Sequence, residues 1–364
     1  MTISTAQQIS GADDAAAANF AEHIGSVLDA GAVAVMLSIG HRTGLFDVLA
    51  ELPPSTSRRI AEHAELAERY VREWLAVMVT GGIVHYDPEQ CTYALPAEHA
   101  ACLTRNAPLG NLALYGQRVA LLGAVQEQTI IRFEDGEGMR YEDYPCFHEI
   151  MAEDSGQTVT AQLFDVILPL AEGIIPRLET GIDVLDAGCA RGSALIALAE
   201  HFPKSRFVGY DLCSDAIAYA RRTADAAELA NITFEVRDLS DYDESDQFDL
   251  ITSFDAVHDQ KDPAALIRSL HRALRTDGVY LMQDIGGSAR LENNLDFPLA
   301  SLLYAISCVH CTPISLGQGG AGLGTMWGWE TAQAMLREAG FTEVQRHVLP
   351  HDPTNVWFVS RKET

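Results

Sequence analysis

The segment that most limits how this chain can fold is Asp183-Val-Leu-Asp-Ala-Gly-Cys-Ala-Arg-Gly192, which runs into the helix-forming residues 193–201. The apolar start predicts a buried strand, and the two glycines predict a tight turn into the helix. In doubly wound α/β domains, such a turn brings the backbone close to a nucleotide-like ligand. The segment therefore predicts an α/β domain with a ligand at the end of this strand.

Strands and helices alternate through the second half of the chain. The predicted strands cover residues 183–187, 206–210, 232–236, 248–254 and 279–282, and the predicted helices cover residues 193–201, 214–228 and 263–275. This alternation predicts a parallel sheet with right-handed crossovers, whose ligands bind at the carboxyl ends of the strands. A functional site is expected there.

Acidic residues end three successive predicted strands. The turn after Asp186 is not the dinucleotide fingerprint, because Ala190 replaces the middle glycine and the spacing differs. Asp211 follows 25 residues after Asp186, where an acid can accept hydrogen bonds from both hydroxyls of a ribose. Asp238 could receive an adenine amino group while Leu239 packs on the ring. Each acid alone could be a helix cap or a solvated carboxylate, but together they favour an adenosine-containing ligand.

Four segments resemble the class I S-adenosylmethionine-dependent methyltransferases, over roughly residues 140–364. They are Asp186-Ala-Gly-Cys-Ala-Arg-Gly192, Tyr210-Asp-Leu212, Arg237-Asp-Leu239 and Phe248-Asp-Leu-Ile-Thr-Ser-Phe254. The resemblance implies a Rossmann-like sheet of seven strands with an antiparallel seventh, for which 355–361 is the candidate. It also implies that the first segment lies under the methionine moiety, the second holds the ribose and the third holds adenine. The candidate cofactor-binding residues are Asp186, Gly188, Cys189, Ala190, Gly192, Asp211, Leu212, Asp238, Leu239 and Phe254.

His258-Asp259 follows the fourth predicted strand and is similar to a motif of small-molecule O-methyltransferases that carry an N-terminal winged-helix dimerisation domain. The resemblance implies that His258 is the general base, a task that suits an imidazole. Asp284 ends the neighbouring strand and is expected to orient His258, although this family has glutamate there. Met326 stands where the family has a second glutamate, and Glu330 is out of register. The alternative for His258 is a loop residue that packs or caps a helix.

The segment 293–324 is the candidate wall of an acceptor pocket, with Phe147 and His148 opposite. The candidate substrate contacts are Phe147, His148, Tyr304 and His310. Cys308-Val-His310-Cys311 contains metal-ligating residue types, but four ligands from one short run fit zinc poorly, so no metal site is expected. Residues 317–324 contain G-x-G-x-x-G without a flanking strand and helix, which predicts a mobile loop over the pocket.

The first half of the chain is predicted to be mostly helical and winged-helix-like. Residues 20–39 are apolar enough for a helix that is buried on most sides, as when a helix packs against a partner chain. Helices over 57–64 and 67–80, followed by strands over 81–84 and 91–95, form a winged helix-turn-helix pattern. From residue 56 to 95 the chain has six acids and four arginines. Because a DNA reader needs a basic face, nucleic acid is an improbable partner.

Composition limits the setting in which the chain works. The net charge of −26 over 364 residues repels polyanions and anionic membrane surfaces. Seven cysteines do not suggest a disulfide framework, so reduced thiols are expected. We found no apolar run long enough for a membrane span and no signal peptide, which predicts a cytoplasmic protein. The expected domains are a helical dimerisation domain over 1–105, connecting helices that cover the active site over 106–180, and a cofactor-binding domain over 181–364.

These features predict a homodimeric S-adenosylmethionine-dependent methyltransferase that acts on a small, partly apolar molecule, with oxygen as the expected acceptor atom. One alternative is an N-methyltransferase that needs no base. Another is a ligand-responsive winged-helix regulator that binds S-adenosylmethionine. A nicotinamide-dependent oxidoreductase is disfavoured by the missing glycine fingerprint. The pocket loops carry no readable code for the acceptor.

Overall fold

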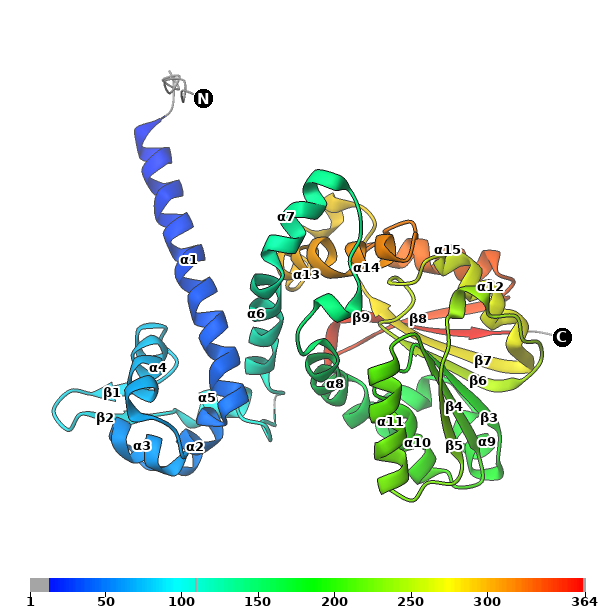
Figure 1. Cartoon of the computed structure of the whole chain (residues 1–364), viewed down its shortest axis with the longest axis horizontal. Coiled ribbons are helices and arrows are strands. Elements are labelled where there is room, and N and C mark those ends of the chain that lie inside the picture. Colours follow the sequence, from blue (N-terminus) through cyan, green and yellow to red (C-terminus); the bar gives the residue numbers. More distant parts are fainter. Residues whose placement is uncertain (1–12, 109, 363–364) are drawn as a thin grey trace. The chain divides into compact units, whose positions relative to one another are not determined.

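The computed structural model describes residues 13–108 and 110–362, and the chain divides into two compact units that meet in sequence between Ala120 and Leu121 (Figure 1). The first unit is helical with one small hairpin. Its elements are α1 (Asp14–Thr43), α2 (Leu45–Glu51), α3 (Ser57–His63), α4 (Glu68–Thr80), β1 (His85–Asp87), β2 (Thr92–Ala94), α5 (Ala97–Leu103) and the short η1 (Leu112–Tyr115). α6 (Gly116–Ala124) crosses the boundary between the units.

The first unit has the winged-helix arrangement that the sequence predicts: α3 and α4 precede the antiparallel β1–β2 hairpin. Its core centres on Trp74, which is buried against Phe46 and donates its indole N–H to the carbonyl of Met36 at 2.8 Å. The expected strand over 81–84 is wrong. The N–H groups of Ile83 and Val84 donate to Met78, so these residues wrap the end of α4, and the strand starts at residue 85.

α1 is longer than expected and far less buried. It begins at the side-chain cap of Asp13 and ends where Gly44 adopts a left-handed φ of 74°. Only Ser38, Gly40 and His41 of α1 are buried, so the expectation of a helix buried on most sides is wrong for the single chain. Its exposed large apolar side chains are Phe20, Ile24, Val27, Leu28, Val35 and Ile39.

Two helical segments are long and apolar enough to cross a membrane by length and composition, namely α1 and Ala300–Gly317. A bent pair, Phe147–Leu170 with Ile174–Thr180, passes the same test if it is counted as one span. The expectation that no segment is apolar enough is therefore wrong. Ala300–Gly317 buries several side chains within the second unit, among them Leu303, Cys311 and Ile314.

A seven-stranded sheet forms the second unit, in the order β5-β4-β3-β6-β7-β9-β8. Its strands are β3 (Asp183–Ala187), β4 (Arg206–Asp211), β5 (Ile232–Val236), β6 (Phe248–Phe254), β7 (Leu274–Ile285), β8 (Glu343–Leu349) and β9 (Asp352–Arg361). β3 to β7 are parallel, and β9 runs antiparallel to both β7 and β8. The predicted Rossmann-like sheet, including the antiparallel seventh strand, is confirmed.

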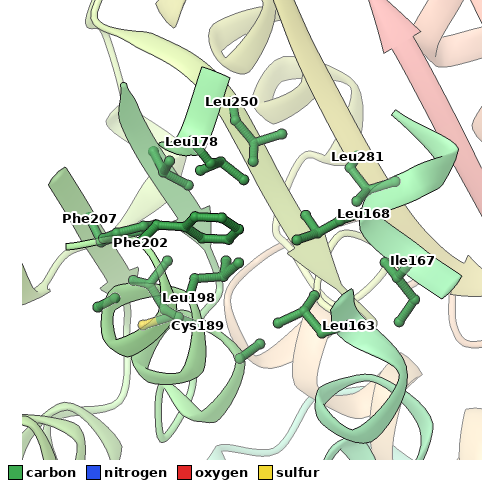
Figure 2. Packing of buried hydrophobic residues seen from close by; sticks show 14 of the residues in the cluster. Leu163, Ile167, Leu168, Leu178, Cys189, Leu198, Phe202, Phe207, Leu250 and Leu281 are labelled. Atoms are coloured by element: carbon green, nitrogen blue, oxygen red, sulfur yellow. The ribbon is translucent and has the colours of Figure 1, made fainter. Parts of the chain in front are cut away.

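Helices cover both faces of this sheet. α9 (Ile174–Thr180), α10 (Ser193–His201) and α11 (Ser214–Ala226) bury their apolar sides on one face, and α12 (Pro263–Ala273) and α15 (Trp329–Glu338) do so on the other. Figure 2 shows the first of these cores, with the labelled side chains Leu163, Ile167, Leu168, Leu178, Cys189, Leu198, Phe202, Phe207, Leu250 and Leu281. This packing fixes the sheet beneath the strand ends where the candidate site lies.

Among the connecting helices predicted over 106–180, the segments 107–129 and 145–169 are each interrupted in the structure. The first contains η1, α6 and the start of α7 (Gln126–Asp135), and the second contains α8 (Phe147–Thr158) and three short turns. Those turns are η3 (Thr160–Gln162), η4 (Leu163–Ile167) and η5 (Leu168–Leu170). The remaining elements are η2 (Tyr141–Asp143), η6 (Leu239–Asp241), η7 (Leu291–Asn294), α13 (Ala300–Ile306), η8 (Ser307–Cys311) and α14 (Thr312–Gly317).

Candidate active site

The turn after β3 is held against the end of β4. The N–H groups of Gly188 and Cys189 both donate to the carbonyl of Tyr210, at 2.9 and 3.0 Å. Gly188 has a φ of +82°, and a Cβ there would lie 2.5 Å from the Cβ of Ala256. Glycine is therefore required both for the backbone conformation and for the close approach of the next loop.

Asp211 organises the same turn from the end of β4. Its Oδ2 accepts the N–H of Ala190 at 2.8 Å, and its Oδ1 accepts the N–H of Cys213 at 2.8 Å. Burial raises the pKa of Asp211, while the two backbone donors act in the opposite direction. Ala190 has a left-handed φ of 45°, a conformation that glycine adopts without strain. Alanine at position 190 therefore costs some free energy of folding that glycine would not.

Asp186 is a buried acid at the end of β3. Its side chain accepts a hydrogen bond of 2.8 Å from the hydroxyl of Thr252. Burial raises the pKa of Asp186 to about 7, and the nearby Asp211 adds to this rise. A buried carboxyl group with this pKa sits well next to a cationic ligand, whose charge would favour the ionised form.

The other candidate cofactor residues differ in exposure. Asp238 caps η6 by accepting the N–H of Ser240 at 2.9 Å, and Leu239 is buried beside it. Leu212 is 43% exposed, so its side chain is open to a ligand, and Phe254 is half-buried. Gly192 begins α10 with a φ of 73°, and Cys189 is buried under the turn.

His258 and Asp284 lie together at the ends of β6 and β7. The Nδ1 atom of His258 is 2.8 Å from Oδ1 of Asp284, and both side chains are buried. The same carboxylate oxygen accepts the indole N–H of Trp327 at 2.9 Å and the backbone N–H of Ile285 at 2.8 Å. Asp284 is thus held by three donors, and the ring orientation of His258 is fixed.

Asp259 occupies the other side of the His258 ring, a contact that sequence reasoning missed. Its Oδ1 lies 3.3 Å from Nε2 of His258, and its Oδ2 accepts the hydroxyl of Tyr141 at 3.4 Å. Burial alone would lower the pKa of His258, but Asp284 and Asp259 raise it well above its ordinary value. The adjacent His-Asp pair in the sequence is the signal that could have shown this contact.

Cys311 completes the surroundings of His258. Its sulfur, a ring nitrogen of His258 and a carboxylate oxygen of Asp259 all lie within 4.8 Å of one another. The hydroxyl of Thr325 donates to the sulfur at 2.8 Å. Burial raises the pKa of the Cys311 thiol to about 11. Cys308, from the same short run, is exposed instead.

Met326 and Glu330 do not supply a carboxylate to His258. Met326 is buried beside Gly287, and the carboxylate of Glu330 accepts the hydroxyl of Ser288 at 2.6 Å and the N–H of Ala289 at 3.1 Å. Trp327, between them in sequence, reaches Asp284 and is another residue that sequence reasoning missed. The sequence indicates this contact of Trp327 only weakly, because a tryptophan before a helix usually indicates packing alone.

Three of the four candidate acceptor residues gather in one aromatic group. The rings of Phe147 and His310 stack with centroids 4.2 Å apart, and His148 lies 5.3 Å from Phe147. Tyr141 lies 5.5 Å from Phe147, so the group reaches the residue that contacts Asp259. Tyr304 is placed elsewhere: its hydroxyl accepts the amide of Asn294 at 2.8 Å, and the ring packs with Ile285, Leu303 and Met326.

Comparisons with known proteins match both parts of the chain. Residues 31–105 match the family described as Rv2258c-like winged HTH domain, and residues 178–340 match a family described as methyltransferase domain. Among curated proteins, the release factor glutamine methyltransferase of Mycobacterium leprae is 30% identical over 126 residues, which are 33% of this chain and 44% of that protein. The malonyl-[acyl-carrier protein] O-methyltransferase of Acetivibrio thermocellus is 27% identical over 108 residues, 30% of this chain and 37% of that protein. The chain thus spans less than half the length of each.

Solved structures match nearly the whole chain. Mitomycin 7-O-methyltransferase MmcR has a TM-score of 0.65 and 18% identity, covering 96% of this chain and 100% of that one. Human N-acetylserotonin methyltransferase, solved with S-adenosylmethionine, has a TM-score of 0.64 and 16% identity, covering 98% and 99%. At these identities the likeness concerns the fold. With the two family matches and the seven-stranded sheet, residues 178–340 are a methyltransferase domain with the class I methyltransferase fold, and an Rv2258c-like winged helix-turn-helix domain precedes it.

Proposed function

We propose that this protein transfers a methyl group from S-adenosylmethionine to a hydroxyl oxygen of a small molecule, with His258 as general base and Asp284 as its positioning residue. The observation that carries the proposal is the 2.8 Å contact between Nδ1 of His258 and Asp284 at the ends of β6 and β7. This contact leaves Nε2 as the ring nitrogen that an acceptor can approach.

The strand ends of β3, β4 and β5 fit the cofactor. The turn at Gly188 has no room for a Cβ, and Asp186 is a buried acid suited to a cationic ligand. Asp211, at the end of β4, is the residue proposed to accept the ribose hydroxyls. Asp238 and Leu239 are the residues proposed for adenine. S-adenosylmethionine, when bound, supplies an electrophilic methyl group on a sulfonium sulfur.

The task of the chain is then to align the acceptor, exclude water and remove one proton. An acceptor hydroxyl that approaches Nε2 of His258 replaces the contact with Asp259. This exchange removes one of the two carboxylates that favour the charged ring. The ring then releases its Nε2 proton to solvent, and the free nitrogen can accept the hydroxyl proton. Asp284 stabilises the imidazolium that results.

The aromatic group of Tyr141, Phe147, His148 and His310 supports an acceptor with a planar or partly apolar body. Aromatic side chains offer large contact areas and prefer to stack on or meet the edges of other rings. Tyr141 lies in this group and also donates to Asp259, so the group adjoins the proposed base. Phe147 and His310 are the residues proposed to contact the acceptor body.

We also propose that the protein is a cytoplasmic homodimer in which a second copy covers α1. The exposed apolar residues of α1, such as Phe20 and Leu28, support an interface of this kind. A lipid bilayer is the other apolar environment that α1 could enter. Analytical ultracentrifugation without detergent tests the proposal: a dimer that Leu28→Glu converts to monomer supports it, and a protein that stays in the membrane fraction overturns it.

A regulator that reads DNA is the less favoured function. The arginines of α4, the helix that would enter the groove, pair with acids on the same helix: Arg72 with Glu68, and Arg69 with Glu73. These pairs leave little free positive charge for phosphates. A gel-shift titration at low salt would favour the regulator only if binding were tight and dependent on sequence.

The experiment that tests the enzyme proposal uses the purified full chain in two steps. Thermal shift with S-adenosylhomocysteine and with NAD separates the methyltransferase from an oxidoreductase, since only the first ligand is expected to raise Tm. Incubation with S-adenosylmethionine carrying a deuterated methyl group and a library of phenols, alcohols and amines follows, read by mass spectrometry. Labelled methyl on oxygen supports the proposal, whereas label on nitrogen alone favours the N-methyltransferase alternative.

A further inference from the structure

The three buried side chains of His258, Asp259 and Cys311 form a group with the composition of a metal centre. Their nearest ligand atoms all lie within 4.8 Å of one another, and each residue is at most 5% exposed. Nitrogen, oxygen and thiolate sulfur are the ligand types that zinc takes in proteins, and three protein ligands with one open position are typical of reactive zinc sites. Zinc–ligand bonds of about 2.0–2.3 Å require the three atoms to draw together by about 1 Å or less.

The surroundings of these residues supply a second, independent observation. Each of the three shares a hydrogen bond with a further side chain: Asp284 accepts from Nδ1 of His258, Tyr141 donates to Asp259, and Thr325 donates to Cys311. Metal-ligating histidines typically give their other ring nitrogen to a carboxylate, and such outer partners fix the ligands in place. Oδ1 of Asp259 meets no hydrogen-bond donor among the described residues, although Nε2 of His258 lies 3.3 Å away.

A second group of the same residue types lacks these supports. His148, Cys213 and Asp215 also come within 4.8 Å of one another. However, the Asp215 side chain is 76% exposed, and Nδ1 of His148 is buried without a hydrogen-bond partner in the described part of the chain. The two groups therefore offer a matched comparison within one protein.

We propose that His258, Asp259 and Cys311 bind one thiophilic divalent cation, with zinc as the expected ion. Binding displaces the thiol proton of Cys311 and the ring proton of His258 to solvent, so that thiolate, neutral imidazole and carboxylate surround the ion. The cation occupies the Nε2 position that the acceptor hydroxyl would use. Zinc is accordingly a reversible inhibitor that competes with the acceptor; this consequence rests on the proposed role of His258, whereas the binding itself does not.

Cobalt(II) is the probe that reports the ligands directly. The chelator-treated full chain, kept reduced, is titrated with cobalt(II) while the near-ultraviolet band for charge transfer from thiolate to cobalt is recorded. We expect one cobalt per chain and a band that disappears in Cys311→Ser. Cys308→Ser, three residues away and exposed, and Cys213→Ser, in the second group, are expected to keep the band.

Folding of the variants is checked by the rise in Tm with S-adenosylhomocysteine. If Cys311→Ser shows no such rise, Asp259→Asn replaces it, and we expect this variant to keep the band but to bind cobalt at least about tenfold more weakly. Absence of a thiolate band at saturating cobalt overturns the proposal, as does loss of the band in Cys213→Ser or Cys308→Ser. Methyl transfer that proceeds without such a band leaves the proposed function intact, so the two claims fail separately.

Discussion

The Nδ1 atom of His258 lies 2.8 Å from Oδ1 of Asp284, although the two residues are 26 positions apart in sequence. His258 follows β6, and Asp284 lies near the end of the neighbouring parallel strand β7. Asp284 also accepts N–H groups from Trp327 and Ile285, so its carboxylate is fixed before any ligand arrives. An enzyme that must remove one proton needs this kind of preorganised pair.

Asp284→Asn should lower kcat for a hydroxylated acceptor by about 10²–10⁴-fold, because an amide cannot stabilise the imidazolium. The KM for the acceptor and the affinity for S-adenosylhomocysteine should change little. Trp327→Phe removes one donor to Asp284 and should cost less, while Asp284→Glu should restore part of the rate. Steady-state kinetics check this; equal losses in Asp284→Glu and Asp284→Asn would contradict a charge-based role.

Asp211→Asn should weaken both the fold and cofactor binding. An amide oxygen can accept only one of the two backbone N–H groups, from Ala190 and Cys213, that now meet the carboxylate. We expect a loss of about 1–3 kcal/mol in the free energy of unfolding and at least about tenfold in affinity for S-adenosylhomocysteine. Asp238→Asn is the matched control for stability alone, since Asp238 accepts one N–H through one oxygen and is itself proposed to bind adenine. Equal losses in the free energy of unfolding of the two variants would contradict the special role of Asp211.

Ala190→Gly should stabilise the protein. Ala190 has a φ of 45°, and the left-handed region costs a non-glycine residue about 1–2 kcal/mol. Glycine also gives the unfolded chain more conformational freedom, which lowers the free energy of unfolding by about 0.4–1 kcal/mol. Denaturant unfolding should therefore show a net gain of about 0.5–1 kcal/mol in the free energy of unfolding. Ala197→Gly, in the middle of α10, should instead lose about 1 kcal/mol. A destabilised Ala190→Gly would show that this position carries no strain.

Asp186 should make stability depend on pH. Its pKa is about 7 in the fold against 3.8 for the ordinary group. Because the pKa of Asp186 is higher in the folded state, protonation of this carboxyl group favours folding. Its contribution to stability is fully present below about pH 4 and is lost as the pH rises through 7. This loss does not occur in Asp186→Asn. The free energy of unfolding of the variant, relative to that of the wild type, should therefore rise by on the order of 2–4 kcal/mol from pH 5 to pH 8. Denaturant unfolding at both pH values checks this, and parallel pH curves would contradict a buried carboxyl with a raised pKa.

Much of the cofactor side could be predicted from sequence, because local patterns determine it. The apolar run before Gly188 and the acids Asp186 and Asp211 lie next to one another in a parallel sheet, where successive strand ends share one edge. His258 and Asp284 could be paired for the same reason. The positions of these residues along the strands therefore predict which side chains lie close together.

The acceptor side could be predicted only in part. Cys311 and Trp327 come close to His258 and Asp284 from a segment of short, broken helices and loops, which have no periodic pattern that places a side chain in space. Tyr304 lies in the predicted segment, yet it packs beside Ile285 instead of joining the aromatic group. The expectation that α1 is buried is wrong for a different reason. A high density of apolar residues indicates that a helix face will be covered, but it does not indicate whether the same chain, a second copy or a lipid bilayer covers it.

Methyl transfer by His258→Gln is the most direct test of the central claim. The variant is compared with the wild type in one assay that uses deuterium-labelled S-adenosylmethionine and the best hydroxylated acceptor, alongside calorimetry with S-adenosylhomocysteine. The account predicts unchanged affinity for S-adenosylhomocysteine and a rate of methyl transfer that falls by about 10²–10⁴-fold. An unchanged rate in a variant that still binds S-adenosylhomocysteine would contradict His258 as the base.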